Sequence, residues 1–152
     1  MEIVHFDKVM QMIKDFSPLE RVLLSTAGTL QTALSAYFGS LVEIRVVSQT
    51  QNDDTHIFRK ISLYSPSKGV EVCRAKTDIT VTLPDVKRLI LDGKYGLGQI
   101  LEIKNIRAVF EIESMGQDEK HFWRVYYLRG PGVVYKIREE FNKALYDGCA
   151  PP

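Results

Sequence analysis

The sequence predicts an α+β fold built on a largely antiparallel sheet. Two observations lead to this class. The first forty residues place apolar side chains at helical spacing, whereas six later segments alternate apolar and polar residues as strands do. The strand segments follow one another through short turns, which is the order of hairpins. Helices first and hairpins afterwards favour antiparallel pairing in a single domain, residues 1–152.

Three helices are expected in the N-terminal part. Apolar residues recur at helical spacing through 6–13. Ser17 is a suitable N-cap, Pro18 suits the first helical position and Glu20 completes a capping box, so a second helix follows through 19–25. A third apolar stripe ends at Gly39 and consists of Leu30, Ala33, Leu34, Tyr37 and Phe38.

The rest of the chain is predicted to be mostly strands. The alternating segments are 41–49, 56–64, 70–81, 105–113, 121–129 and 133–141. Polar or glycine-containing turns separate the hairpin strands, for example 65–69 and 130–132. Between the third and fourth strands we expect a short helix from Pro84 to Leu91 and a brief helix within 95–103.

The length, composition and net charge of the chain limit the classes of protein to which it can belong. A chain of 152 residues with 45% apolar content can bury a core, and its formal net charge of +1 does not indicate a nucleic-acid-binding surface. The sequence has no apolar run long enough to span a membrane, and its N-terminus does not resemble a signal peptide. Cys73 and Cys149 are expected to be reduced. We therefore expect a cytoplasmic protein that binds neither membranes nor nucleic acid.

No cofactor or metal is predicted. His5, His56 and His121 lie on separate elements without a second ligand at metal-binding spacing. The glycine-containing segments lack the strand–loop–helix context of a phosphate loop. Nothing near either cysteine would lower its pKa, so neither is expected to be a nucleophile. A cofactor-free function is therefore preferred.

Two predicted strands each place a charge on an apolar face. Arg59 shares its parity with Ile57, Ile61 and Leu63, and Glu139 shares its parity with Val133, Tyr135, Ile137 and Phe141. Side chains alternate across a strand, so both charges should point inward. A buried charge needs a partner. Two alternatives remain open: the two residues form a core ion pair, or they bind a small anionic ligand.

Arg107 is a further candidate. Ile106, Ala108, Phe110 and Ile112 share one face of the predicted strand, and Arg107 lies on the other face, near the strand start. The pattern alone favours a solvated surface charge there. A loop at the strand start would instead turn Arg107 toward a site opening.

Five blocks of the sequence resemble one family. In order, SPLERVLLSTAGTL, FRKISL, AKTDI, GLGQIL and IREEF resemble the chorismate pyruvate-lyases that form 4-hydroxybenzoate, and in particular the branch found in archaea and some bacteria. The resemblance extends from Ser17 to Phe141. It implies a six-stranded antiparallel sheet with helices packed on one face and an enclosed pocket beneath helical flaps.

The resemblance also implies site residues. The ligand arginine of the family falls on Arg59 and its acidic residue on Glu139. The flap leucine whose backbone amide faces the ligand matches Leu97, and a ligand-contacting helix position matches Leu30, with Thr29 as the alternative. The family's pair after the flap appears here as Ile106 and Arg107, so Arg107 is a candidate for substrate binding.

The chain departs from the family pattern around the site. Ala27 replaces an acidic residue of relatives, Gln31 stands where threonine is frequent, and Asn142 replaces a proline. Arg59 and Glu139 still match the ligand arginine and the acidic residue of the family. The departures therefore affect the expected identity of the substrate more than the expected fold.

The function implied is conversion of chorismate to 4-hydroxybenzoate and pyruvate without a cofactor. Arg59 and Glu139 are the expected catalytic residues, and the substrate and product are the expected partners. The alternatives are a non-catalytic module of the same fold that binds an aromatic or dicarboxylic acid, a structural protein with an Arg59–Glu139 ion pair, and a lyase for a modified chorismate. The sequence predicts neither the oligomeric state nor the pathway that uses the product.

Overall fold

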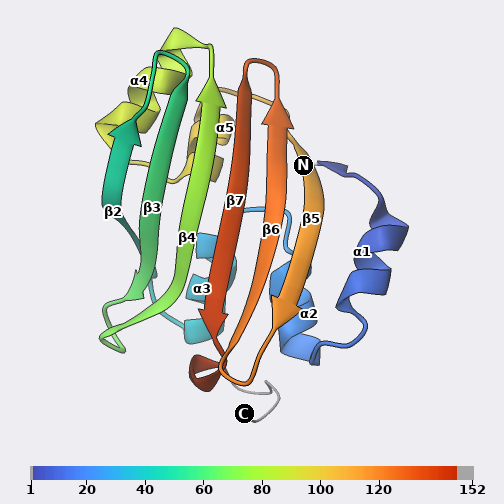
Figure 1. Cartoon of the computed structure of the whole chain (residues 1–152). Coiled ribbons are helices and arrows are strands. Elements are labelled where there is room, and N and C mark those ends of the chain that lie inside the picture. The colour runs from blue at the N-terminus through green and yellow to red at the C-terminus, as the bar shows by residue number, and fades with distance from the viewer. Residues whose placement is uncertain (1, 147–152) are drawn as a thin grey trace.

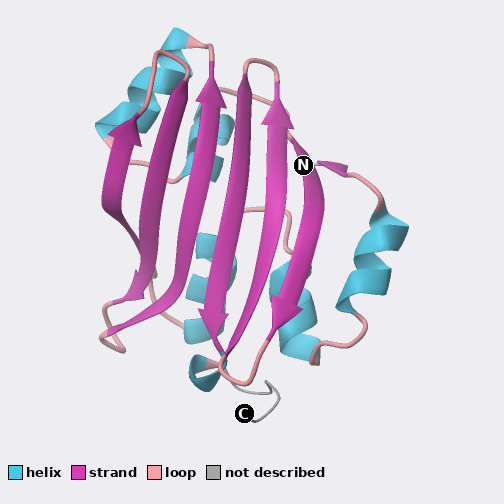
Figure 2. Cartoon of the chain, viewed as in Figure 1, coloured by secondary structure: helices cyan, strands magenta, loops and turns pink. Residues whose placement is uncertain are grey.

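The computed structural model describes residues 2–146, so Cys149 lies outside the described part of the chain. It is an α+β fold with an antiparallel sheet of six strands and five α-helices, as predicted (Figures 1 and 2). The elements are β1 (Glu2–Ile3), α1 (Phe6–Ile13), α2 (Pro18–Ser25), α3 (Leu30–Phe38), β2 (Glu43–Gln51), β3 (His56–Ser65), β4 (Val70–Val81), α4 (Pro84–Asp92), α5 (Leu97–Ile103), β5 (Val109–Gln117), β6 (His121–Gly130), β7 (Val133–Asn142) and the 3₁₀ helix η1 (Lys143–Leu145).

The sheet joins two antiparallel halves, in the order β1-β5-β6-β7-β4-β3-β2. Strands β2–β4 form one half and β5–β7 the other, and the pairing of β4 with β7 connects them. The two-residue strand β1 adds a parallel pair to the edge of β5. It was not predicted, because two residues are too few to display an alternating pattern.

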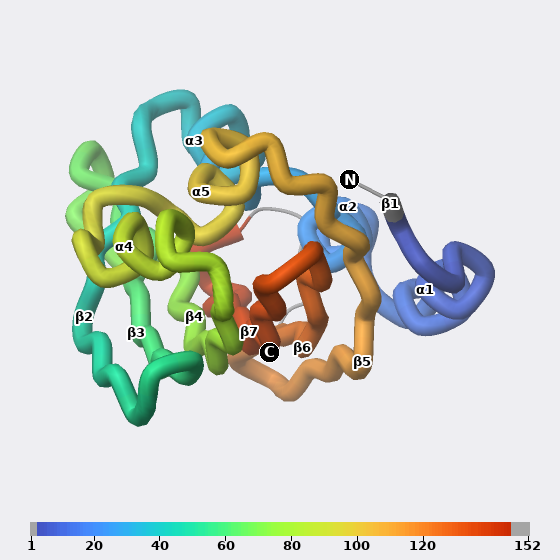
Figure 3. The backbone as a smooth tube through the Cα atoms, turned by 90° about the horizontal axis from the view of Figure 1, so that it is seen from above, coloured from blue at the N-terminus to red at the C-terminus, as the bar shows by residue number. Residues whose placement is uncertain are grey.

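Helices α2, α3, α4 and α5 lie on one face of the sheet, and α1 lies beyond its β5 edge (Figure 3). Strand β4 shows how the sequence specifies this arrangement, because its buried and exposed residues alternate from Cys73 to Val81. The buried residues from position 73 onward are Cys73, Ala75, Thr77, Ile79 and Val81. The predicted period of two therefore selects the face that the helices cover.

The start of β5 differs from the prediction. The alternating pattern began at residue 105, whereas the strand begins at Val109. Asn105 has a positive φ of 53°, and the Ile106 amide donates to the Leu101 carbonyl at 2.8 Å, which turns the chain at the end of α5. Arg107 therefore lies in the connecting loop and not in a strand.

The predicted capping box of α2 is present, and it gives a stability prediction. The Ser17 amide donates to the Glu20 carboxylate at 2.9 Å, and the Glu20 amide donates to Ser17 Oγ at 3.4 Å. We expect Ser17→Ala to lower the free energy of unfolding by about 1 kcal/mol in urea denaturation. Ser25→Ala is the matched control, because Ser25 Oγ donates to carbonyls of its own helix, those of Arg21 and Val22, and caps no helix start. Equal losses in both variants would contradict the capping role.

No helix among residues 2–146 is long and apolar enough to cross a bilayer.

Candidate active site

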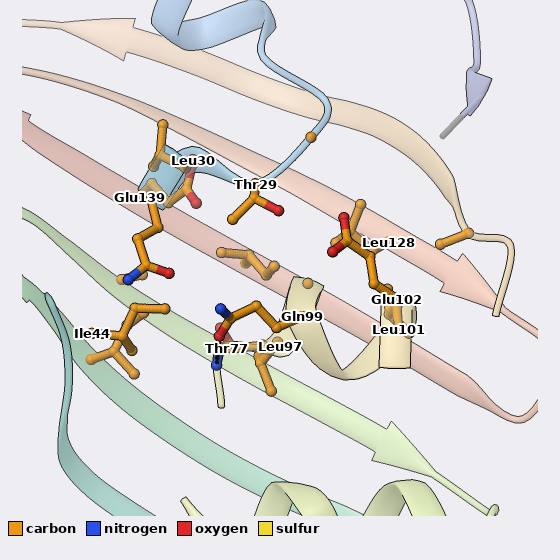
Figure 4. Close-up of a pocket in the computed structure, with 18 of the residues that line it drawn as sticks. Thr29, Leu30, Ile44, Thr77, Leu97, Gln99, Leu101, Glu102, Leu128 and Glu139 are labelled. Carbon is orange, nitrogen blue, oxygen red and sulfur yellow. Dashed lines mark hydrogen bonds between the residues drawn. The ribbon is translucent and has the colours of Figure 1, made fainter. Parts of the chain in front are cut away.

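A cavity of about 260 Å³ lies between the sheet and its helices. Its floor comes from β3, β4, β6 and β7, and its walls come from β2, the starts of α3 and α5, and the loop before β5 (Figure 4). Most lining side chains are apolar. The polar or charged side chains are Thr29, Gln31, Thr77, Gln99, Glu102, Arg107, Tyr126 and Glu139. A largely apolar cavity with a few polar groups is the usual form of a small-molecule site.

The floor of the cavity is organised in two neighbouring cross-strand rows. One row runs across β3, β4, β7 and β6 and consists of Ile61, Ala75, Glu139 and Arg124. The next row crosses the same strands and consists of Arg59, Thr77, Ile137 and Tyr126. An arginine therefore stands at each side of the floor, Arg59 on β3 and Arg124 on β6.

Glu139 points into the interior, as its parity predicted. The residue is only 5% exposed. Its Oε1 accepts a hydrogen bond from Arg124 Nε at 2.6 Å, and its Oε2 accepts one from the Tyr126 hydroxyl at 2.7 Å. The carboxylate also lines the cavity. Its charge is thus balanced by Arg124, and the predicted alternative of a core ion pair between Arg59 and Glu139 is wrong.

Arg124 is the residue that the sequence analysis missed. It is fully buried, and its Nη1 donates to the carbonyls of Leu24 at 2.9 Å and Thr26 at 2.8 Å. Burial alone would lower the pKa of Arg124, but the charge and hydrogen bond of Glu139, with further neighbours, raise it overall. The signal was present in the sequence. Arg124 shares its parity with the buried residues Phe122, Tyr126 and Leu128.

Tyr126 completes the group around Glu139. Burial, together with the charge of Glu139, raises the pKa of the Tyr126 phenol well above its ordinary value. The hydroxyl therefore stays protonated and donates to Glu139. The guanidinium plane of Arg124 also lies over the Tyr126 ring, 4.4 Å from its centre.

Arg59 is buried as predicted, but its partners are neutral. It is 1% exposed and donates from Nε to Gln49 Oε1 at 2.7 Å. Its two terminal nitrogens donate to the Tyr95 carbonyl at 3.0 Å and the Ile90 carbonyl at 2.5 Å. No carboxylate pairs with it in the part of the chain that the structure describes, and burial lowers its pKa. Arg59 is therefore a buried cation without a counter-charge.

Arg59 stands beside the cavity and does not line it. Its neighbour in the row, Thr77, lines the floor, and Gly96, next to its acceptor Tyr95, lines the wall. Thr77 is 3% exposed and is one of the few polar residues on the floor. The guanidinium is thus bonded to the last part of α4 and to the α4–α5 connection.

The other predicted residues lie around the cavity. Leu30 begins α3 and Leu97 begins α5, and both line the walls, as does the alternative candidate Thr29. Gly96 is placed before α5 by a hydrogen bond from its amide to Gln99 Oε1 at 2.9 Å. A Cβ at this position would lie 2.5 Å from the end of the Ile44 side chain, so a larger residue would displace Ile44 in the opposite wall.

Arg107 lines the cavity and is at the same time exposed to solvent. The loop before β5 carries it, because the chain has already turned at Asn105. Its location satisfies both interpretations of the sequence: the charge is solvated, and it borders the site.

One of the three departures from the family pattern, Gln31, lies at the cavity. The Gln31 side chain lines it and donates to the Val42 carbonyl at 2.8 Å, which fastens α3 to the segment before β2. Ala27 packs partly buried against the core in the α2–α3 connection. Asn142 lies away from the cavity and caps η1 through a bond from the Ala144 amide at 3.0 Å.

Burial raises the pKa of the Cys73 thiol well above its ordinary value, so the thiolate nucleophile is disfavoured. Within residues 2–146, no three His, Cys, Asp or Glu side chains gather into a metal-binding group.

No protein-family model matches the chain, and no curated protein matches it either.

Proposed function

We propose that this protein is a lyase that converts chorismate to 4-hydroxybenzoate and pyruvate without a cofactor, in a pocket closed over its ligand. The observation that carries the proposal is Arg59, a fully buried cation that has only neutral partners. Its strand neighbour Thr77 lines an apolar cavity. Such a charge is costly without a counter-ion. A ligand carboxylate would supply it.

The cavity supports a ligand of this size and kind. Its volume of about 260 Å³ is near the lower end of small-molecule pockets, which fits one substituted six-membered ring. Apolar side chains such as Leu63 and Leu128 would contact the ring faces. Thr77, Tyr126 and Glu139 provide the few hydrogen-bonding groups on the floor.

Arg59 is proposed to bind the ring carboxylate. A guanidinium has five N–H groups arranged as a fork, and only three of them are used in the bonds to Gln49, Ile90 and Tyr95. A carboxylate would accept two parallel charge-assisted bonds, which neutral carbonyls cannot match. We propose that the ligand replaces the Tyr95 carbonyl on Arg59. The exposed Arg107 would take the enolpyruvyl carboxylate at the cavity rim.

The elimination depends more on how the pocket positions the substrate than on catalytic side chains. The ring carbon that carries the hydroxyl loses its proton, and the ether bond on the neighbouring carbon breaks. The electron pair of that bond leaves with enolpyruvate, which takes up a proton and becomes pyruvate, while the ring becomes aromatic. Glu139 is proposed to accept a hydrogen bond from the ring hydroxyl and to assist removal of the proton. Exclusion of water by the helices and the backbone amide of Leu97 would hold the reacting geometry.

The test is direct. Purified protein mixed with chorismate should release 4-hydroxybenzoate, followed by its absorbance, and an equal amount of pyruvate, followed with a coupled dehydrogenase. Chorismate alone and heat-denatured protein are the controls. Chorismate recovered unchanged after prolonged incubation would exclude this activity.

A non-catalytic binding module is the second candidate. One observation favours it. Both oxygens of Glu139 already accept hydrogen bonds from Arg124 and Tyr126, and these bonds make the carboxylate a weaker base toward the substrate. A binder would hold an aromatic or dicarboxylic acid unchanged. Calorimetric binding of 4-hydroxybenzoate without turnover of chorismate would identify a binding module. A lyase for a modified chorismate is a separate alternative, and the departures at Ala27 and Gln31 make such a compound the next substrate to test.

We expect 4-hydroxybenzoate to inhibit its own formation. The product keeps the ring carboxylate, so Arg59 should bind it about as well as it binds the substrate, and release from a closed pocket should limit turnover. Initial rates at increasing added product should give competitive inhibition with an inhibition constant at or below KM. 4-Hydroxybenzamide, which lacks the carboxylate, is the matched control and should inhibit weakly. Equal inhibition by both compounds would contradict the role of Arg59.

A further inference from the structure

Arg124 joins two parts of the molecule that the sequence separates widely. Its Nε binds the Glu139 carboxylate on β7 at 2.6 Å, and its Nη1 binds the carbonyls of Leu24 and Thr26 at the end of α2. The side chain is fully buried, so water does not compete for these bonds. One guanidinium thus fixes both a cavity carboxylate and a helix terminus.

The helix terminus in question leads directly into the cavity wall. The chain from Thr26 continues to Gly28, Thr29 and Leu30, all of which line the cavity. Helix α2 has no basic residue of its own in its last turn. Arg124 supplies from the sheet the positive charge that favours a helix C-terminus.

Arg59 has the same arrangement on the other side of the floor. It binds the carbonyl of Ile90 near the end of α4 and that of Tyr95, just before the cavity residues Gly96 and Leu97. The chain leading into the α3 wall and the chain leading into the α5 wall are therefore each bonded to the sheet by one buried arginine. The difference is that Arg124 has a carboxylate partner and Arg59 has none.

We propose that Arg124 is a positioning residue that couples the α2–α3 wall of the cavity to the orientation of Glu139. This inference rests on the proposed function for its catalytic consequence. Because the guanidinium is rigid and planar, its bonds to α2 fix the direction of Nε, and Nε fixes Oε1 of Glu139. Tyr126 binds the same carboxylate but makes no hydrogen bond to α2, so it can hold Glu139 without this coupling.

The kinetic test is a double-mutant cycle with Arg124→Lys and Glu139→Gln. Lysine keeps the charge but lacks the fork, so it cannot hold α2 and Glu139 together. We expect Arg124→Lys to lower kcat by about tenfold or more with a smaller change in KM, and the same substitution to have little further effect in the Glu139→Gln background. Independent, additive losses would show that Arg124 only stabilises the fold, and would overturn the inference.

The second arm needs no turnover. Hydrogen exchange of the backbone amides in 26–31 should be faster in Arg124→Lys than in the wild-type protein, and unchanged in the control Tyr126→Phe, which removes the other bond to Glu139. Equal exchange in all three proteins overturns the coupling. If wild-type protein neither converts chorismate nor binds 4-hydroxybenzoate, the proposed function fails, and the exchange experiment still decides whether Arg124 couples the wall to the sheet.

Discussion

Replacing Arg59 with alanine is expected to lower kcat/KM for chorismate by about 10³-fold, because truncating one partner of a buried charge pair leaves the other charge without compensation. In this protein the stranded charge would be the ring carboxylate of the ligand. The variant should also lose affinity for 4-hydroxybenzoate. Initial rates with chorismate and calorimetric titration with the product measure the two effects.

Two further variants test the two cations proposed to bind the carboxylates of the ligand. Arg59→Lys keeps a positive charge but offers a point charge in place of a fork, so an intermediate loss is expected. Arg107→Ala removes an exposed cation, and we expect a smaller loss that lies mainly in KM and weakens with added salt. Circular dichroism spectra should confirm that each variant is folded. Wild-type turnover in folded Arg59→Ala would exclude the proposed site.

The sequence predicted the fold well because its signals are local. The six alternating segments, the capping box at Ser17 and Glu20, and the glycine after α3 are each visible within about a dozen residues, and the structure has all of them. The predicted start of β5 was wrong, because the turn at Asn105 depends on a positive φ and not on a side-chain pattern. Strand β1 gave no pattern at all.

The site was harder to predict because its partners are distant in sequence and partly made of backbone. Parity placed Arg59 and Glu139 inside, and both are buried. The acceptors of Arg59 are the carbonyls of Ile90 and Tyr95, which no side-chain pattern reveals. Arg124 was accessible to the same parity argument, because it alternates with Phe122, Tyr126 and Leu128, which are buried.

The Arg124–Glu139 pair leads to the largest expected change in stability. Both side chains are nearly inaccessible to solvent, with a separation of 2.6 Å between Arg124 Nε and Glu139 Oε1. Replacing only Glu139 with leucine leaves a buried cation without a counter-charge, and replacing only Arg124 with leucine leaves a buried anion. We expect each single variant to lose about 3–5 kcal/mol of unfolding free energy in urea denaturation.

Replacing both residues with leucine should cost much less than the sum of the single losses. Removing two buried charges together also removes their desolvation penalty, and apolar replacement of such pairs is often neutral. A residual loss of about 1–3 kcal/mol is expected, because the carbonyls of Leu24 and Thr26 lose their donor. Additive losses would show that the two charges do not stabilise each other. A stable double variant that no longer converts chorismate would mean that the pair is needed for the site and not for folding, since the fold would then tolerate an apolar core where the activity does not.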